Sequence, residues 1–480
     1  MAPLRIEWYG DISGFPPPVW MNLLDSGAIM AIARAQPMTL ALPCIGIDAC
    51  SQALVDMRVP FVVKYAYDIK ACLARPLTAL HGDISHFHLG HIDGDLLAAD
   101  VHAWERVDGV VAGPPCPPWS QCGKRGSWTD PRAQVFRKVH DIIIDQGHKG
   151  ARFFILEMVP GMDEMHSRND RTRHSTPFAD WLADLSTRAP MWEVHVWKMD
   201  TANYLPQHRE RIYTVGVNKH MSCRSPQPPR RPAPEERIML SNLLHPGIEP
   251  NQEQDLPARL RWNLFSAKMR FRDRMRRLPE TGHGSGNLVA EIDRSPDATW
   301  NFPLRCDGCT PTLRANQVQF LWVVLPDLGI SRALHPVERL TLQGFPPELA
   351  RGLSKAEVVH AAGNACSVPV MGAVLVQVLS ACQPALLPDS HWPLNAQTNH
   401  GHAETLQQLR VAALGTEVAW LQAQTSALKR EQEWVEALTQ TLLRRRAQAL
   451  CRALPAMEQR MATVPSMTDD STVTGPRHSE

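Results

Sequence analysis

A short apolar run that ends in a cluster of prolines constrains this chain more than any other stretch. Residues 107–112 read Val-Asp-Gly-Val-Val-Ala, and residues 113–120 read Gly-Pro-Pro-Cys-Pro-Pro-Trp-Ser. The mostly apolar run predicts a buried strand, which Gly113 and the prolines then end. We therefore expect the thiol of Cys116 at the carboxyl end of a strand, where open α/β sheets place their ligands. A cysteine in its thiolate form is also a strong nucleophile.

Strand and helix patterns alternate on both sides of this run. Apolar Val135, Phe136, Val139, Ile142 and Ile143 recur at helical spacing. Strand patterns occupy residues 38–45, 61–67, 107–112, 153–157, 192–197 and 211–217. This alternation predicts βαβ units and an α/β fold with a parallel sheet.

Composition excludes several classes of protein. Apolar residues make up 44% and charged residues 21% of the chain, as in ordinary globular proteins. No apolar run is long enough to predict a membrane span, and acidic Glu7 and Asp11 do not fit a signal peptide. The odd number of cysteines, 11, favours a reducing compartment. Cys306 and Cys309 form a lone close pair, so we expect no metal site.

Changes in pattern divide the chain into segments. Residues 218–300 are rich in Pro and Arg and have poor periodicity, whereas the segment after residue 311 returns to strand-like character. The predicted division is an extension (1–37), a cofactor-binding and catalytic domain (38–217), a target-recognition domain (218–325), a return to the catalytic domain (326–385), a linker (386–402), a helix (403–454) and a disordered tail (455–480).

Six blocks of the sequence resemble the cytosine-C5 DNA methyltransferases, and they occur in the order found in that family. The blocks are residues 113–120, 130–136, 156–159, 203–211, 338–346 and 363–370. The resemblance implies a Rossmann-like, S-adenosylmethionine-dependent methyltransferase domain with an inserted, irregular target-recognition domain and a C-terminal helical extension. It implies that the protein methylates C5 of cytosine in double-stranded DNA.

The same resemblance implies a site for S-adenosylmethionine. The implied cofactor-binding residues are Cys44, Ile45, Gly46, Asp68, Ile69, Asp83, Ile84, Pro115 and Asn364. The first turn departs from the family pattern, because Cys44 stands near its phenylalanine and Asp48 near its second glycine. Without that glycine we expect a looser turn or a shifted cofactor.

The resemblance also assigns the chemistry. Cys116 would attack C6 of a flipped cytosine, and Glu157 in its protonated form would hydrogen-bond N3. Arg211 would brace Glu157, and Arg209 would support the loop or contact phosphate. Met158 replaces the family's asparagine. The expected substrate contacts are Ser120, Gln121, Gln207, Thr312, Leu313 and the basic residues Arg270, Arg272 and Arg274.

The C-terminal segment carries a seven-residue repeat. Leucine or valine recurs at Leu414, Leu421, Leu428, Val435 and Leu442. The repeat favours self-association through a coiled coil of residues 403–454, and the alternative is a lone helix that packs on the body.

Two other functions stay open at this stage. One is an RNA-directed cytosine-C5 methyltransferase of the same fold, although the Cys-Phe-Thr element of the tRNA-methylating branch is not found. The other is a DNA-binding regulatory protein with a degenerate cofactor site. The expected location is the nucleus in a eukaryote and otherwise the cytoplasm, with the chromosome.

Overall fold

The computed structural model describes residues 20–33, 37–120, 126–164, 175–245, 248, 253–277, 287–294, 304–315, 320–326, 329–382 and 440. The expected helix 403–454, the linker and the tail therefore lie outside the described residues, apart from residue 440. Within the N-terminal segment, α1 covers Ser26–Ala33.

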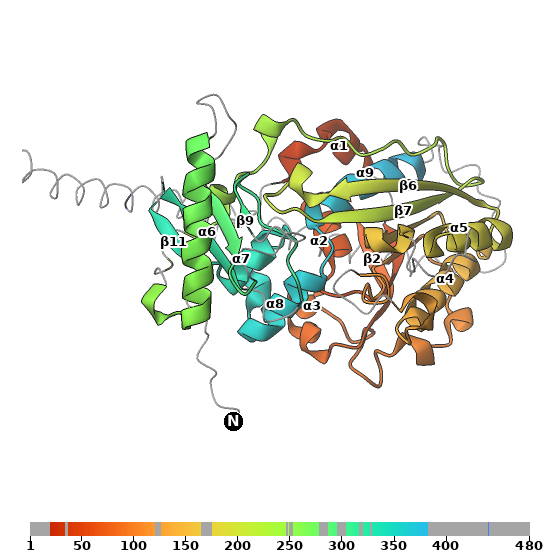
Figure 1. Cartoon of the computed structure of the whole chain (residues 1–480). Helices are drawn as coiled ribbons and strands as arrows, with labels where there is room; N and C mark the ends of the chain where they lie inside the picture. The colour runs from red at the N-terminus through yellow and green to blue at the C-terminus, as the bar shows by residue number, and fades with distance from the viewer. Residues whose placement is uncertain are drawn as a thin grey trace, which may run out of the picture.

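A seven-stranded sheet forms the centre of the protein, in the order β3-β2-β1-β4-β5-β7-β6 (Figure 1). The strands are β1 (Met38–Pro43), β2 (Phe61–Asp68), β3 (His88–Leu89), β4 (Gly109–Ala112), β5 (Phe153–Met158), β6 (Trp192–Asp200) and β7 (Glu210–Asn218). β7 runs antiparallel to β5 and β6, and the remaining pairs are parallel. All six strands expected from the sequence before residue 218 are confirmed, and so is the α/β class.

Helices cover both faces of this sheet (Figure 1). The first face packs against α1, α2 (Ala49–Asp56) and α9 (Val368–Cys382), and the second packs against α4 (Ala133–His148) and α5 (Pro177–Arg188). The helix predicted between β4 and β5 from the spacing of apolar residues is confirmed, because Phe136, Val139, Ile142 and Ile143 of α4 are all buried. The remaining helices of the large domain are α3 (Ala74–His81), α7 (Pro336–Thr341) and α8 (Lys355–Asn364).

A second, antiparallel sheet lies beside the first, in the order β11-β10-β8-β9 (Figure 1). Its strands are β8 (Leu288–Glu291), β9 (Leu304–Arg305), β10 (Leu321–Leu325) and β11 (Ile330–Ala333), and helix α6 (Ala258–Arg277) packs on it. This region is more regular than the sequence suggested. The periodicity is hard to see because few residues of α6 are buried and the apolar Trp262, Phe265 and Met269 are exposed on its other faces.

The small sheet also extends past the boundary expected at residue 325. β11 pairs antiparallel with β10, from Trp322 opposite Ala333 to Leu325 opposite Ile330. The chain therefore returns to the large domain only after Ala333, where α7 follows.

One stretch of the described chain, Lys355–Cys382, is long and apolar enough to cross a membrane by length and composition. In this protein 83% of its most apolar window is buried. It comprises α8 and α9, and nearly every residue of α9 packs inside the large domain. The stretch is therefore a pair of core helices.

A buried ion pair joins the small sheet to helix α7 where the chain returns to the large domain. Arg332 of β11 donates to both carboxylate oxygens of Glu338 in α7, at 2.9 and 2.7 Å. The backbone amides of His245 and His335 donate to the same carboxylate, each at 2.8 Å. The two side chains are 2% and 0% exposed, so the carboxylate depends on these four donors in place of water.

Replacing Glu338 with Gln should therefore destabilise the protein by about 3 kcal/mol, because it leaves Arg332 buried without a counter-charge. Urea unfolding followed by tryptophan fluorescence measures this loss. The matched control is Glu236→Gln, since Glu236 pairs with Arg230 on the surface, where solvent screens the pair and its contribution to stability is small. Equal effects of the two substitutions would contradict a special role for the buried pair.

Candidate active site at the edge of the parallel sheet

Cys116 lies on the loop that directly follows β4, as the sequence predicted. The backbone amides of Trp119 and Ser120 both donate to the carbonyl oxygen of Cys116 at 3.0 Å, so the loop closes on itself. Trp119 is 2% exposed and meets Phe136 edge-on at 5.2 Å. A Cβ on Gly161 would lie 2.2 Å from the carbonyl oxygen of Trp119, so only glycine fits there. The loop that presents the thiol is therefore anchored on the second face of the sheet.

Glu157 and Arg211 form an ion pair beside this loop. Glu157 lies in β5, Arg211 lies in β7, and the two strands are neighbours in the sheet. The Nε atom of Arg211 lies 2.9 Å from Oε1 of Glu157, and the side chains are 13% and 4% exposed. A Cβ on Gly113 would lie 3.5 Å from the other oxygen, Oε2. The carboxylate is thus held at the start of the cysteine loop.

The electrostatics of Cys116 show that these groups form one cluster. Burial, followed by the charge of Glu157, raises the pKa of the thiol to about 11. The charges of Arg211 and Arg209 act in the opposite direction. At neutral pH the free protein therefore holds Cys116 mainly as the thiol, and the proton must leave when the sulfur attacks a substrate.

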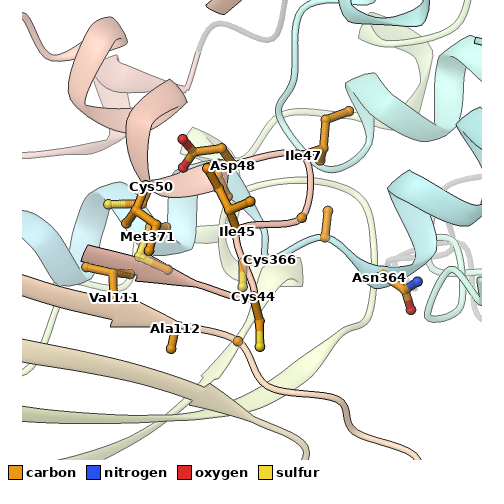
Figure 2. A pocket seen from close by; sticks show the side chains of 15 residues that line it. Cys44, Ile45, Ile47, Asp48, Cys50, Val111, Ala112, Asn364, Cys366 and Met371 are labelled. Carbon is orange, nitrogen blue, oxygen red and sulfur yellow. The ribbon is translucent and has the colours of Figure 1, made fainter. Parts of the chain in front are cut away.

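An open cavity of about 440 Å³ lies next to the cluster, at the carboxyl ends of β1 and β4. Figure 2 shows Val111, Cys50 and Met371 at one end of it and Asn364 at the other. Its lining includes the predicted cofactor residues Cys44, Ile45, Gly46 and Asn364, together with Asp48 and residues 111–113.

Asp68 ties the first turn to the end of β2. Its Oδ2 accepts from the amide of Gly46 and its Oδ1 from the amide of Lys70, both at 2.9 Å. Burial raises the pKa of Asp68, and these two hydrogen bonds oppose that shift. Each carboxylate oxygen keeps a lone pair for a ligand, so Asp68 fits the expected partner of ribose hydroxyls. Ile69 beside it is 45% exposed.

Five predicted cofactor residues do not line the cavity: Asp68 and Ile69, and also Asp83, Ile84 and Pro115. The carboxylate of Asp83 is exposed and accepts from the amide of Ser85 at 2.8 Å. The side chain of Ile84 packs on the core of the large domain. Pro115 lies in the cysteine loop and is half-buried. The cavity is therefore lined by the turn that follows β1 and by Asn364, but not by the segment that contains Asp83 and Ile84.

The turn itself differs from the looser one expected without a second glycine. Asp48 has a φ of 64°, a left-handed conformation that glycine adopts easily. Its side chain accepts from the amide of Ser51 at 2.9 Å and caps α2. Asp48 thus adopts the backbone conformation of a tight turn, and its side chain stabilises that turn.

Gln207, Leu313 and Arg209 are buried inside the protein. The first two were expected to contact the substrate, and the third to support the loop or contact phosphate. Gln207 is 0% exposed, donates to the carbonyl of Leu342 at 2.9 Å and accepts from the amide of Leu313 at 3.2 Å. Leu313 is itself 1% exposed. Arg209 is 3% exposed and donates to the carbonyls of Leu313 and Ala365 at 3.3 and 2.7 Å. Their partners lie more than a hundred residues away, which no local pattern reveals.

The other residues expected to contact DNA differ in how exposed they are. Ser120 is half-buried in the cysteine loop, and Thr312 donates its hydroxyl to the carbonyl of His208 at 2.7 Å. Arg270 and Arg272 are exposed on α6. Gln121 and the side chain of Arg274 lie outside the described residues.

Cys366 belongs to the site although the sequence analysis did not select it. Its Sγ lies 3.4 Å from where a Cβ on Gly113 would stand, and it lines the cavity. Burial, and then the charge of Glu157, raises its pKa. The available signal was its position inside the last family block, directly after Asn364 and Ala365.

His208 lies between two carboxylates that belong to different sheets. Its Nδ1 is 3.1 Å from Oδ2 of Asp200, and its Nε2 is 3.0 Å from Oδ2 of Asp307. Asp307, Cys309 and His208 are close enough for a metal ion. However, Arg305 and the amide of Cys309 also donate to Asp307, so the carboxylate is already neutralised. The cluster is best described as an ionic contact between the domains.

This contact makes stability depend on pH. Hydrogen bonds to Asp200 and then to Asp307 raise the pKa of His208 to about 11, above its ordinary value of 6.5. Because the folded pKa is raised, the contribution is complete below pH 6.5 and is lost as pH rises toward 11. Wild type should therefore lose stability across this window more steeply than His208→Gln, as measured by urea unfolding from pH 6 to 10. Parallel profiles would contradict the contact.

Comparison with known proteins identifies relatives across most of the chain. The family model described as C-5 cytosine-specific DNA methylase matches residues 65–380. "Type II methyltransferase M.NlaX" of Neisseria lactamica is 24% identical over 301 residues, which cover 60% of this chain and 81% of that protein. "Type II methyltransferase M.HpaII" of Haemophilus parainfluenzae is 26% identical over 306 residues, or 60% and 76% of the two chains. The solved Entamoeba histolytica methyltransferase EhMeth aligns with a TM-score of 0.47 at 12% identity, over 73% of this chain and all of that one.

Proposed function

The chain belongs to the C-5 cytosine-specific DNA methylase family, and from this premise we propose how its own residues carry out the reaction. Members transfer a methyl group from S-adenosylmethionine to C5 of cytosine in DNA, and this chain is a methyltransferase of that kind. The observation that carries our assignment is the cluster of Cys116, Glu157 and Arg211 beside the cavity at the end of β4.

Cys116 is the nucleophile in this proposal. C5 of cytosine is a weak nucleophile until a bond forms between sulfur and C6, which turns C5 into an enamine-like carbon. The thiol loses its proton as this bond forms. After methyl transfer, the proton on C5 leaves and the bond between sulfur and C6 breaks, which restores the ring and the free cysteine. Because C6 is hidden inside a duplex, the cytosine must first be flipped out.

Glu157 stabilises the charge that develops on the base. It reaches N3 with a hydrogen bond while its other side is held by Arg211. The short spacing of the ion pair, 2.9 Å, keeps the carboxyl group from turning away during attack. Cys366 and Arg209 shape the pocket around this acid without contacting the reacting atoms.

The cavity is the site of S-adenosylmethionine, which supplies an electrophilic methyl group when it is bound. In this proposal Asp68 accepts the ribose hydroxyls, and Asn364 lies at the methionine end. Backbone atoms of residues 44–46 form the floor. The fit rests on the place of the cavity at the sheet edge and on the fixed carboxylate of Asp68 at the end of β2.

The small sheet with α6 is the target-recognition part, and its exposed Arg270 and Arg272 contact DNA phosphates. The family match favours DNA over the RNA-directed alternative and over a regulatory protein. The named relatives are bacterial, which favours the cytoplasmic of the two expected locations. Self-association through residues 403–454 remains our proposal from the repeat of leucines.

Replacing Cys116 with Ala should abolish methyl transfer and leave the fold intact, because the nucleophile is lost and its small side chain is half-buried. Duplex DNA containing 5-fluorocytosine should trap the wild-type protein covalently, since fluorine at C5 blocks the final elimination. Peptide mapping of the trapped complex locates the bond. The control is Cys223→Ala, which removes an exposed thiol outside the site. Trapping at another cysteine would refute the assignment.

Replacing Glu157 with Gln should slow the chemical step by about 10²-fold, the usual loss when one charge-stabilising group is removed. Single-turnover kinetics with saturating DNA measure this step. Affinity for the duplex should change little, because the side chain is buried. An unchanged rate with weakened DNA binding would instead make Glu157 a structural residue.

A further inference from the structure

The turn between β1 and α2 contains three residues with left-handed backbones within five positions. Cys44, Gly46 and Asp48 have φ values of 60°, 58° and 64°. Glycine adopts this conformation freely, whereas other residues adopt it at a cost, which is smaller for aspartate than for most. Cys44, Gly46 and Asp48 all line the cavity, so their conformation sets its shape.

The carboxylate of Asp48 holds the end of this turn by two contacts. Oδ1 accepts from the amide of Ser51 at 2.9 Å, which caps α2. Oδ2 lies 2.8 Å from Nε2 of His81. The backbone of Asp48 is also fixed, since its amide donates to Ile45 and its carbonyl accepts from Gln52, both at 3.1 Å. Asp48 is only 2% exposed, so water cannot replace these partners.

His81 is the last residue of α3 and belongs to a different βα unit from Asp48. Its side chain is 9% exposed. The ring meets Phe87 edge-on at 4.9 Å and Phe61 at 6.2 Å, so aromatic packing fixes its orientation. The contact therefore ties the N-terminus of α2 to the C-terminus of α3 across the first turn.

We propose that Asp48 and His81 form a positioning pair that fixes the cofactor turn in a shape for which the family uses glycine. Asp48 supplies the left-handed residue and the helix cap, and Nε2 of His81 gives the buried carboxylate a hydrogen-bonding partner. Asp68 holds the middle of the turn through Gly46, and the pair holds its end. The inference rests on the proposed cofactor site, and it concerns neither Cys116 nor Glu157.

A series at Asp48 separates backbone conformation from charge. Asp48→Gly should bind S-adenosylhomocysteine within about threefold of wild type, because glycine takes a positive φ without strain and is itself an acceptable cap. Asp48→Ala should bind about tenfold more weakly or worse, because it combines strain with loss of the cap. Isothermal titration without DNA measures both. The control is Asp95→Ala, which removes a comparable cap on Leu97 away from the cavity and should not change the affinity.

A second series tests the pair itself. His81→Leu should weaken cofactor binding, because it leaves the buried carboxylate of Asp48 without its partner. Adding Asp48→Asn to this variant should restore much of the affinity, since a neutral amide tolerates the left-handed conformation and needs no counter-charge. A second substitution that repairs the first is not expected of two unrelated residues.

Kinetics distinguish a pair that positions the cofactor turn from one that takes part in the reaction. Asp48→Ala should raise the KM for S-adenosylmethionine more than it lowers kcat, with DNA affinity unchanged. The proposal is overturned if Asp48→Gly binds as weakly as Asp48→Ala, if His81→Leu binds like wild type, or if the double variant is no better than His81→Leu. Cofactor affinity is read without DNA, so failure of the proposed methyl transfer to cytosine would leave this test standing.

Discussion

The ion pair between Arg211 and Glu157 is the interaction on which the reaction centre depends. β7 runs antiparallel beside β5, and this pairing brings a guanidinium to within 2.9 Å of a carboxylate in a nearly dry environment. Burial, and then the carboxylate, raises the pKa of Cys116, while the guanidinium lowers it. Both strands must keep their register for the acid to face the cysteine loop, because a slip of one residue would turn its side chain to the other face of the sheet.

The segment just before β7 contacts the second domain. Residues 206–208, just before β7, pair with Thr310 of the target-recognition part through backbone hydrogen bonds of 2.8 Å. The amide of Gln207 and the ring of His208 then join this contact to α7 and to Asp307. These contacts attach the small sheet three residues before Arg211. In the proposed function they place the DNA-binding surface next to the strand that positions Glu157.

The sequence could predict the positions of six strands along the chain and the place of Cys116, because apolar runs and prolines are local signals. It could not predict which polar residues are buried. Gln207 and Leu313 were expected at the substrate, yet each is enclosed by segments distant in sequence. Asp48 was expected to loosen a turn that it caps, because its partner His81 lies 33 residues away. Helix α6 was hidden because few of its residues are buried and apolar side chains are exposed on its other faces.

The most direct test of the account is to determine which nucleic acid receives the methyl group and on which atom of the base. Purified protein should be incubated with labelled S-adenosylmethionine and either duplex DNA or tRNA, followed by digestion to nucleosides and mass spectrometry. The account predicts 5-methyldeoxycytidine from DNA and no label in tRNA. Label in tRNA alone, or on a nitrogen of cytosine, would contradict it.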